Sequence, residues 1–105
     1  MEYLFTYGLF RDAGKFVLGS DAVHCGKAYV EGKIYKVNEF YPGFVPGEGK
    51  VWGDVYLFND KNLPKMDEYE GDEYVRTKVR TSTDIECWIY QYRFDVTNLE
   101  EINSR

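Results

Sequence analysis

Histidine, cysteine and long apolar runs are all scarce in this chain of 105 residues. One histidine and two cysteines cannot complete a four-ligand zinc site without carboxylates. Cys25 and Cys87 also lack the CxxC spacing of zinc and redox motifs and are too few for a disulfide framework. No apolar run approaches the roughly 18 residues of a membrane span. We therefore expect no metal site, no cofactor held by such a site, and no membrane insertion.

Basic side chains are in the minority as well. Thirteen Lys and Arg residues stand against eighteen Asp and Glu residues, which gives a formal net charge of −5. This charge repels a phosphate backbone, so we expect no nucleic-acid partner. The first residues, Met1-Glu2-Tyr3, place an acid where a secretory signal is basic, and Arg11 interrupts the apolar stretch. Together with the low cysteine content, these features predict a cytoplasmic protein.

Aromatic residues, in contrast, are abundant. Ten Tyr, seven Phe and two Trp make up 18% of the chain, so the composition is that of a folded protein. A chain of this length can bury one core but not two. We therefore expect a single domain over residues 1–105, without internal repeats or linkers. The oligomeric state is left open by the sequence.

Apolar alternation predicts several strands. Glycines at positions 26 and 32 predict bulges or turns within the second of them, and Ser82-Thr83-Asp84 predicts a tight turn between the last two. A loop rich in Gly and Pro is expected from Tyr41 to Gly49, as a simple connection or as the lid or wall of a pocket. The predicted strands cover residues 3–7, 22–37, 51–58, 74–81 and 85–94.

One helix is predicted between Asn62 and Gly71. Asn62 is a suitable N-cap, Pro64 lies in the first turn, and Gly71 can end the helix in the left-handed conformation. A short helix is also predicted over residues 11–18, and a last helical turn from Thr97 onward. Because strands outnumber helices and follow one another in sequence, we predict an α+β fold. Its mainly antiparallel sheet is expected to curl into a small barrel with one or two short helices.

The segment Tyr7-Gly8-Leu9-Phe10 is the first candidate for chemistry. It lies where a strand ends, and its glycine allows successive backbone N–H groups to point outward together. Such a nest binds an anion, for example a carboxylate. The alternative is a plain turn at the end of a strand.

The acidic run from Asp67 to Tyr74 is the second candidate. Its carboxylates lie near the C-terminal end of the predicted helix, where the helix dipole raises a carboxyl pKa. Asp67 and Glu70 are three residues apart, so they share a face and repel one another when ionised. If that face is buried among aromatic rings, the pKa rises further, as a general acid and base requires. The alternative is a solvated acidic helix end.

The adjacent pair His24-Cys25 suggests a thiolate–imidazole dyad. Neighbouring residues on a strand point to opposite faces, however, so the two side chains cannot easily meet. We therefore predict a core cysteine beside an exposed or capped histidine.

The order of the motifs resembles that of one known family, the gamma-glutamylcyclotransferase-like or AIG2-like family. The resemblance covers residue 3 to about residue 94, and the spacing of the motifs is more specific than any one of them. The motifs are Tyr7-Gly8-x-Phe10-Arg11, Tyr41-Pro42-Gly43, Gly49-x-Val51-x-Gly53-x-Val55-Tyr56, Met66-Asp67-x-x-Glu70-Gly71, Tyr74-x-Arg76 and Trp88-x-Tyr90.

The resemblance implies an α+β fold with a small barrel and a cavity. It also implies cleavage of a gamma-glutamyl amide by intramolecular attack, which releases 5-oxoproline and a free amine without a metal or cofactor. The glycine loop, here Tyr7, Gly8, Leu9 and Phe10, would hold the α-amino and α-carboxylate groups of the substrate. Glu70 would transfer the protons, and Tyr74 would orient Glu70 or the substrate. Activities of this kind are described by the terms transferase and lyase.

One position departs from the family pattern. A small hydroxyl residue usually follows the loop glycine, and this chain has Leu9 there. The main-chain contacts of the loop do not depend on that side chain, whereas a hydroxyl contact does. Two hypotheses follow: an enzyme acting through Glu70, and a non-catalytic module that binds small acids or a protein partner on the same fold.

Overall fold

The alternating apolar segments form strands, and the segment before Gly71 forms a helix. The computed structural model of the chain describes residues 1–7, 19, 21–38 and 41–102. The predicted helix over residues 11–18 therefore lies outside the described residues. In chain order the elements are β1 (Glu2–Thr6), β2 (Val23–Lys36), β3 (Pro42–Phe58), the 3-10 turn η1 (Asp60–Asn62), α2 (Leu63–Glu70), β4 (Tyr74–Arg80), β5 (Glu86–Tyr92) and β6 (Glu101–Ile102).

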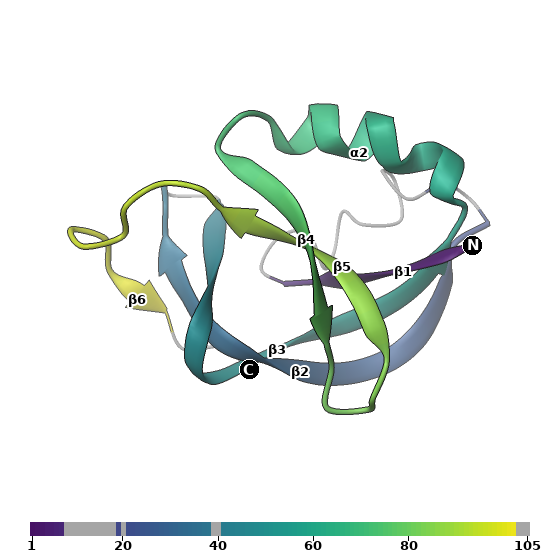
Figure 1. Cartoon of the computed structure of the whole chain (residues 1–105), viewed down its shortest axis with the longest axis horizontal. Coiled ribbons are helices and arrows are strands. Elements are labelled where there is room, and N and C mark those ends of the chain that lie inside the picture. The colour runs from purple at the N-terminus through teal and green to yellow at the C-terminus, as the bar shows by residue number, and fades with distance from the viewer. Residues whose placement is uncertain (8–18, 20, 39–40, 103–105) are drawn as a thin grey trace.

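The six strands form one mixed sheet in the order β4-β5-β1-β3-β2-β6. Most neighbours are antiparallel, but β5 runs parallel to β1, where Leu4 pairs with Trp88, and parallel to β3, where Phe44 pairs with Gln91. The crossover through α2 and β4 brings β5 back in this direction. The α+β class is confirmed and most pairings are antiparallel as predicted, but the sheet is mixed and does not close into the predicted barrel. The sheet bends strongly but stays open, with β4 and β6 as its edges (Figure 1).

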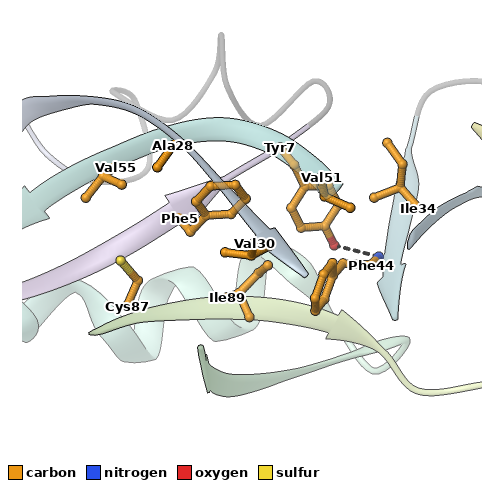
Figure 2. Close-up of a cluster of buried hydrophobic side chains, with 10 residues drawn as sticks. All are labelled: Phe5, Tyr7, Ala28, Val30, Ile34, Phe44, Val51, Val55, Cys87 and Ile89. Atoms are coloured by element: carbon orange, nitrogen blue, oxygen red, sulfur yellow. Dashed lines mark hydrogen bonds between the residues drawn. The ribbon is translucent and has the colours of Figure 1, made fainter. Parts of the chain in front are cut away.

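The central strands are buried on both faces. Leu4 and Phe5 are adjacent on β1 and point to opposite sides, and each is no more than 1% exposed. One side, inside the bend of the sheet, holds a cluster contributed by β1, β2, β3 and β5 (Figure 2). The other side packs against α2 through Met66, which is fully buried. The helix is therefore fixed to the sheet one turn before its end.

The segment rich in Gly and Pro is a strand rather than the predicted loop. Residues Pro42 to Val45 pair with Lys36 to Lys33 of β2, and pairing resumes at Lys50 and Glu31. The residues between, 46–49, lie opposite a break in register, and this break accommodates Pro46, which has no N–H to donate. The predicted irregularities at Gly26 and Gly32 are confirmed, because the register shifts at both places.

The helix ends before Gly71 as predicted, but Gly71 has a ψ of −170° and does not adopt the left-handed helical conformation, and the helix also begins differently. Gly71 has a φ of 80°, and its N–H bonds to the Asp67 carbonyl at 3.1 Å. Asn62 has helical dihedrals and no capping bond; instead, the Asn59 side chain accepts from the Lys61 N–H at 3.0 Å and caps η1.

The C-terminal part of the described chain also differs from its prediction. The last helical turn expected from Thr97 is wrong: an isolated turn, closed by the Leu99 N–H on the Val96 carbonyl, is followed by β6, which pairs with Ile34 and Tyr35 of β2. Among the described residues, no helix is both long enough and apolar enough to cross a membrane.

Candidate active site

Glu70 is the last residue of α2, one turn after the buried Met66. Residues four apart lie on the same helix face, so the packing of Met66 turns Glu70 toward the sheet as well. The Glu70 side chain is half-buried, and this burial raises its pKa from 4.5 to about 7. It has no hydrogen bond or ion pair with the residues that the structure describes. The pKa of this carboxyl is thus close to neutral pH.

A cavity of about 200 Å³ lies beside this carboxyl, between α2, the start of β4 and the turn before β3. The Tyr74 hydroxyl donates to the Pro42 carbonyl at 2.8 Å and ties β4 to β3 at the cavity wall. Burial and the nearby Glu70 charge raise the pKa of Tyr74, so this hydroxyl stays protonated. The lining includes Asn38, Tyr41, Tyr69, Glu70, Glu73 and Tyr74.

Tyr7 lies deeper, at the end of β1. Its hydroxyl donates to the Tyr90 carbonyl at 2.5 Å. The same hydroxyl accepts from the Phe44 N–H at 3.0 Å, and Figure 2 shows this bond. Burial raises the pKa of Tyr7, and the charges of Tyr74 and Glu70 contribute in the same direction. Tyr7 is therefore within electrostatic reach of Glu70. Its side chain fixes the strand from which the chain continues into Gly8, Leu9 and Phe10, which lie outside the described residues.

A hydrogen-bonded network holds the helix that carries Glu70. Arg76 of β4 donates twice to the Asp67 carboxylate, at 2.9 and 3.1 Å, and the Tyr90 hydroxyl of β5 donates to it at 2.7 Å. Burial alone would raise the pKa of Asp67, but these donors outweigh it and lower the pKa below its ordinary value. Asp67 is thus ionised and paired with a cation. The high pKa of Glu70 arises from burial and not from repulsion between the two carboxylates.

The His24-Cys25 pair does not form a dyad within this site. His24 Nε2 lies 2.9 Å from Asp54 Oδ1, so the histidine is capped as predicted. The expectation of a core cysteine is wrong for Cys25, which is exposed because it lies in the irregular stretch between His24 and Lys27. Cys87 is the buried cysteine, and burial raises its pKa to about 11.

A larger hollow of about 410 Å³ lies away from Glu70, beside Tyr29 and Thr81. Its ionisable side chains, Glu31 and Arg80, are exposed, and Arg80 pairs with Asp84 at 2.9 Å. Neither of these two charged side chains is removed from solvent to the extent that Glu70 is. Among the residues described, no cluster of three or more His, Cys, Asp or Glu side chains could hold a metal ion.

The structure places Tyr74 in the same cavity as Glu70, and Tyr7 within electrostatic reach of both. Tyr41, Tyr69 and Glu73 also line the cavity, although the sequence analysis gave them no binding role. A signal for Tyr41 was present, because it opens the segment interpreted as a lid or pocket wall. Glu73 and Tyr69 were hidden within the acidic run, where spacing alone does not show which side chains face inward.

Comparison with known proteins shows the family to which the chain belongs. The family model described as "Gamma-glutamyl cyclotransferase, AIG2-like" matches residues 4–105. The Gamma-glutamylcyclotransferase family protein ytfP of Citrobacter rodentium is 31% identical over 105 residues, which cover 96% of this chain and 90% of that protein.

Solved structures show the same fold. The solution structure of protein ytfP from Escherichia coli superposes with a TM-score of 0.77 at 31% identity, covering 97% of this chain and 92% of that one. An AIG2-like protein from Mus musculus superposes with a TM-score of 0.80 at 22% identity, covering 100% and 88%. With the match over residues 4–105, these findings show that the chain belongs to the AIG2-like gamma-glutamyl cyclotransferase family.

Proposed function

We propose that this protein is a gamma-glutamyl cyclotransferase-type enzyme that converts a gamma-glutamyl amide into 5-oxoproline and a free amine. The observation that carries the proposal is Glu70, a half-buried carboxyl beside a cavity that has no ion pair with a described residue and whose pKa is raised to about 7 by burial. A group that titrates near neutrality can both take and return a proton, as this reaction demands. Membership of the family supports the substrate class.

The reaction joins two ends of one substrate. The α-ammonium nitrogen loses a proton to the Glu70 carboxylate and attacks the γ-carbonyl carbon. The new C–N bond closes a five-membered ring, and the bond from that carbon to the leaving amine breaks. Glu70 returns its proton to the departing nitrogen, and the ring nitrogen loses a second proton, which ends on the released amine as its ammonium, so the protons balance without a further reactant. Holding the substrate folded supplies much of the rate, because the attack is intramolecular.

The remaining groups bind and orient the substrate. In the proposed pose, the backbone N–H groups around Gly8 hold the α-carboxylate, since Gly8 follows Tyr7 directly at the end of β1. Tyr7 fixes that strand end through its two main-chain hydrogen bonds. Tyr74 forms the cavity wall next to Glu70, and its hydroxyl stays protonated. The half-buried position of Glu70 limits the access of water, which favours ring closure over hydrolysis.

The test is an assay for 5-oxoproline after incubation with a panel of gamma-glutamyl amines and peptides. The wild type should release 5-oxoproline from at least one of them, and Glu70→Gln should lower kcat/KM by at least about 100-fold. Glu68→Gln is the matched control, because it removes the same charge from an exposed position of the same helix. Its activity should equal that of the wild type.

Two results would contradict the proposal. One is full activity in Glu70→Gln, and the other is the absence of 5-oxoproline with every substrate of the panel. If glutamate or 5-oxoproline raised the melting temperature in the second case, the protein would be a binding module instead. Leu9 is the feature of this sequence that motivates that alternative.

A further inference from the structure

The apolar contacts of α2 do not by themselves fix the direction in which Glu70 points. The helix buries Met66 fully and Leu63 in part, and these two residues are three apart, so they form one apolar line along the helix. A helix of eight residues held by that line alone could roll about its own axis. Glu70 lies at the end of the same face, and a roll would carry its carboxyl away from the sheet.

Asp67 supplies a contact beside this line. Its carboxylate accepts two hydrogen bonds from Arg76 of β4, at 2.9 and 3.1 Å, and one from the Tyr90 hydroxyl of β5, at 2.7 Å. Donors on two different strands fix the carboxylate in two directions, and the paired bonds of a guanidinium also define its plane. The Asp67 carbonyl accepts the Gly71 N–H at 3.1 Å, so Asp67 anchors both the side and the end of the last turn.

Both donors are themselves held in place. The guanidinium carbon of Arg76 lies 4.3 Å from the centre of the Trp88 ring, a cation–π contact. Tyr90 is 4% exposed, so its ring is fixed by the close packing around it. We call Asp67, Arg76 and Tyr90 the clamp. None of the three is among the described residues that line the cavity at Glu70, so the clamp acts on the helix from outside that cavity.

We propose that Asp67 is a positioning residue: the clamp fixes the rotation of the last turn of α2 and so holds the Glu70 carboxyl against the cavity. The inference rests on the proposed function for the role of Glu70 in proton transfer. It goes further in giving a second acid of the same run a separate task that requires no contact with the substrate. The clamp also keeps Glu70 partly out of water, and this burial raises the pKa of Glu70 to about 7.

The pKa of Glu70 in the folded protein tests this role without any turnover. NMR follows the side-chain carboxyl carbon of 13C-labelled glutamate against pH, and the Glu70 signal is assigned by its absence in Glu70→Gln. Loss of the clamp lets water reach Glu70, so its pKa should fall from about 7 to about 6 or lower in Asp67→Ala, and by less in Tyr90→Phe. Asp67→Asn keeps an acceptor for Tyr90 and should retain a higher value than Asp67→Ala. A change in global stability alone does not move this pKa while the protein stays folded.

Arg76→Met separates positioning from a direct effect of charge. A direct effect would lower the Glu70 pKa when Asp67 loses its negative charge and raise it when Arg76 loses its positive charge, whereas loss of the clamp lowers it in both variants. Tyr92→Phe and Glu68→Gln are the matched controls outside the clamp, and both should leave the pKa at about 7. The titratable and charged groups described around Glu70 are Asp67 and Tyr69 of α2, Tyr7 of β1, Tyr41 before β3, Glu73 before β4, Tyr74 and Arg76 of β4, and Tyr90 of β5.

Kinetics provides a second measurement under the proposed function. At about pH 8.5, where Glu70 is ionised in every variant, Asp67→Ala should lower kcat by about 10-fold or more, since a displacement of about 1 Å suffices for such a loss. KM should change little, because the clamp lies outside the cavity. A loss confined to KM would contradict the positioning role.

Two NMR results would overturn the inference while leaving the proposed function standing. One is an unchanged Glu70 pKa in both Asp67→Ala and Tyr90→Phe, and the other is a pair of opposite shifts in Asp67→Ala and Arg76→Met. If Asp67→Ala does not fold, Tyr90→Phe decides the question, because it loses a single oxygen atom. If no amide yields 5-oxoproline, the proposed function fails, and the NMR titration still decides whether the clamp holds Glu70 in place.

Discussion

Replacing Glu70 with glutamine should stabilise the protein, and only at high pH. In the folded state burial raises the pKa of Glu70 from 4.5 to about 7. The folded protein therefore binds this proton more tightly than the unfolded chain does. By linkage, the Glu70 contribution to the free energy of unfolding falls as the pH rises from about 4.5 to about 7 and then stays low. Glutamine has nearly the same shape and carries no charge at any pH, so it removes this destabilisation.

The magnitude follows from the pKa shift. At about 1.36 kcal/mol for each pKa unit, a rise from 4.5 to about 7 corresponds to at most about 3.4 kcal/mol. Glu70 keeps some contact with solvent, which screens its charge, so we expect about 2 kcal/mol above pH 8. A domain of this size unfolds with an entropy of about 0.22 kcal/mol/K, so the difference amounts to about 9 °C in Tm.

Thermal unfolding of the wild type and Glu70→Gln at about pH 4.5 and about pH 8.5 measures the effect. Comparing the two proteins at each pH cancels the contributions of all other titrating groups. Glu68→Gln is the control, and its exposed position predicts a small shift that is similar at both pH values. An equal Tm difference for Glu70→Gln at both pH values would refute the reasoning, as would a lower Tm of this variant at about pH 8.5.

Three further predictions concern the site and its support. Under the proposed function, kcat/KM should rise with pH and level off above an apparent pKa of about 7, because the Glu70 carboxylate is the base; a profile flat from pH 5 to 9 would contradict this role. Tyr90→Phe deletes the 2.7 Å hydrogen bond to Asp67 and should lower the free energy of unfolding by about 1.5–3 kcal/mol in urea denaturation. Tyr92→Phe, whose hydroxyl has no bond to a described residue, serves as its control and should cost less; equal losses would show that the bond contributes nothing. Gly53→Ala should destabilise by more than about 2 kcal/mol, because a Cβ at that position would lie 2.1 Å from the Thr6 carbonyl oxygen; an unchanged urea midpoint would mean that β1 can shift away from β3.

Local patterns predicted the individual elements better than their assembly. The helix before Gly71 and the strand at residues 51–58 were predicted because periodicity and glycine placement act over a few residues. The segment from Tyr41 to Gly49 was misread, because its prolines and glycines occupy the strand start and a register break. This strand start and this register break form only when β3 pairs with β2. The parallel pairing of β5 was not predictable either, since it depends on the path of the whole crossover.

For the candidate site as well, the sequence predicted individual residues better than the contacts between them. The motif order predicted Glu70 as the proton-transfer residue and Tyr74 as its neighbour, and the structure places both on one cavity. The partners of Asp67 come from two strands, through Arg76 and Tyr90. Without these contacts, the sequence predicted a repelling pair of carboxylates. Contacts formed in the folded structure decide which carboxylate of an acidic cluster is paired with a cation and which is instead buried with a raised pKa.

The position of β1 has a consequence for biosynthesis. This strand is synthesised before its neighbours β3 and β5, which lie far along the chain, with Tyr3 opposite Leu57 and Leu4 opposite Trp88. At roughly 5–20 residues per second, several seconds pass before either neighbour is available. During that interval Leu4 and Phe5, which end up in the middle of the sheet, have no native partner to cover them. The nascent chain is thus exposed to aggregation until β3 and β5 have been synthesised, and chaperones that shield β1 should raise the yield.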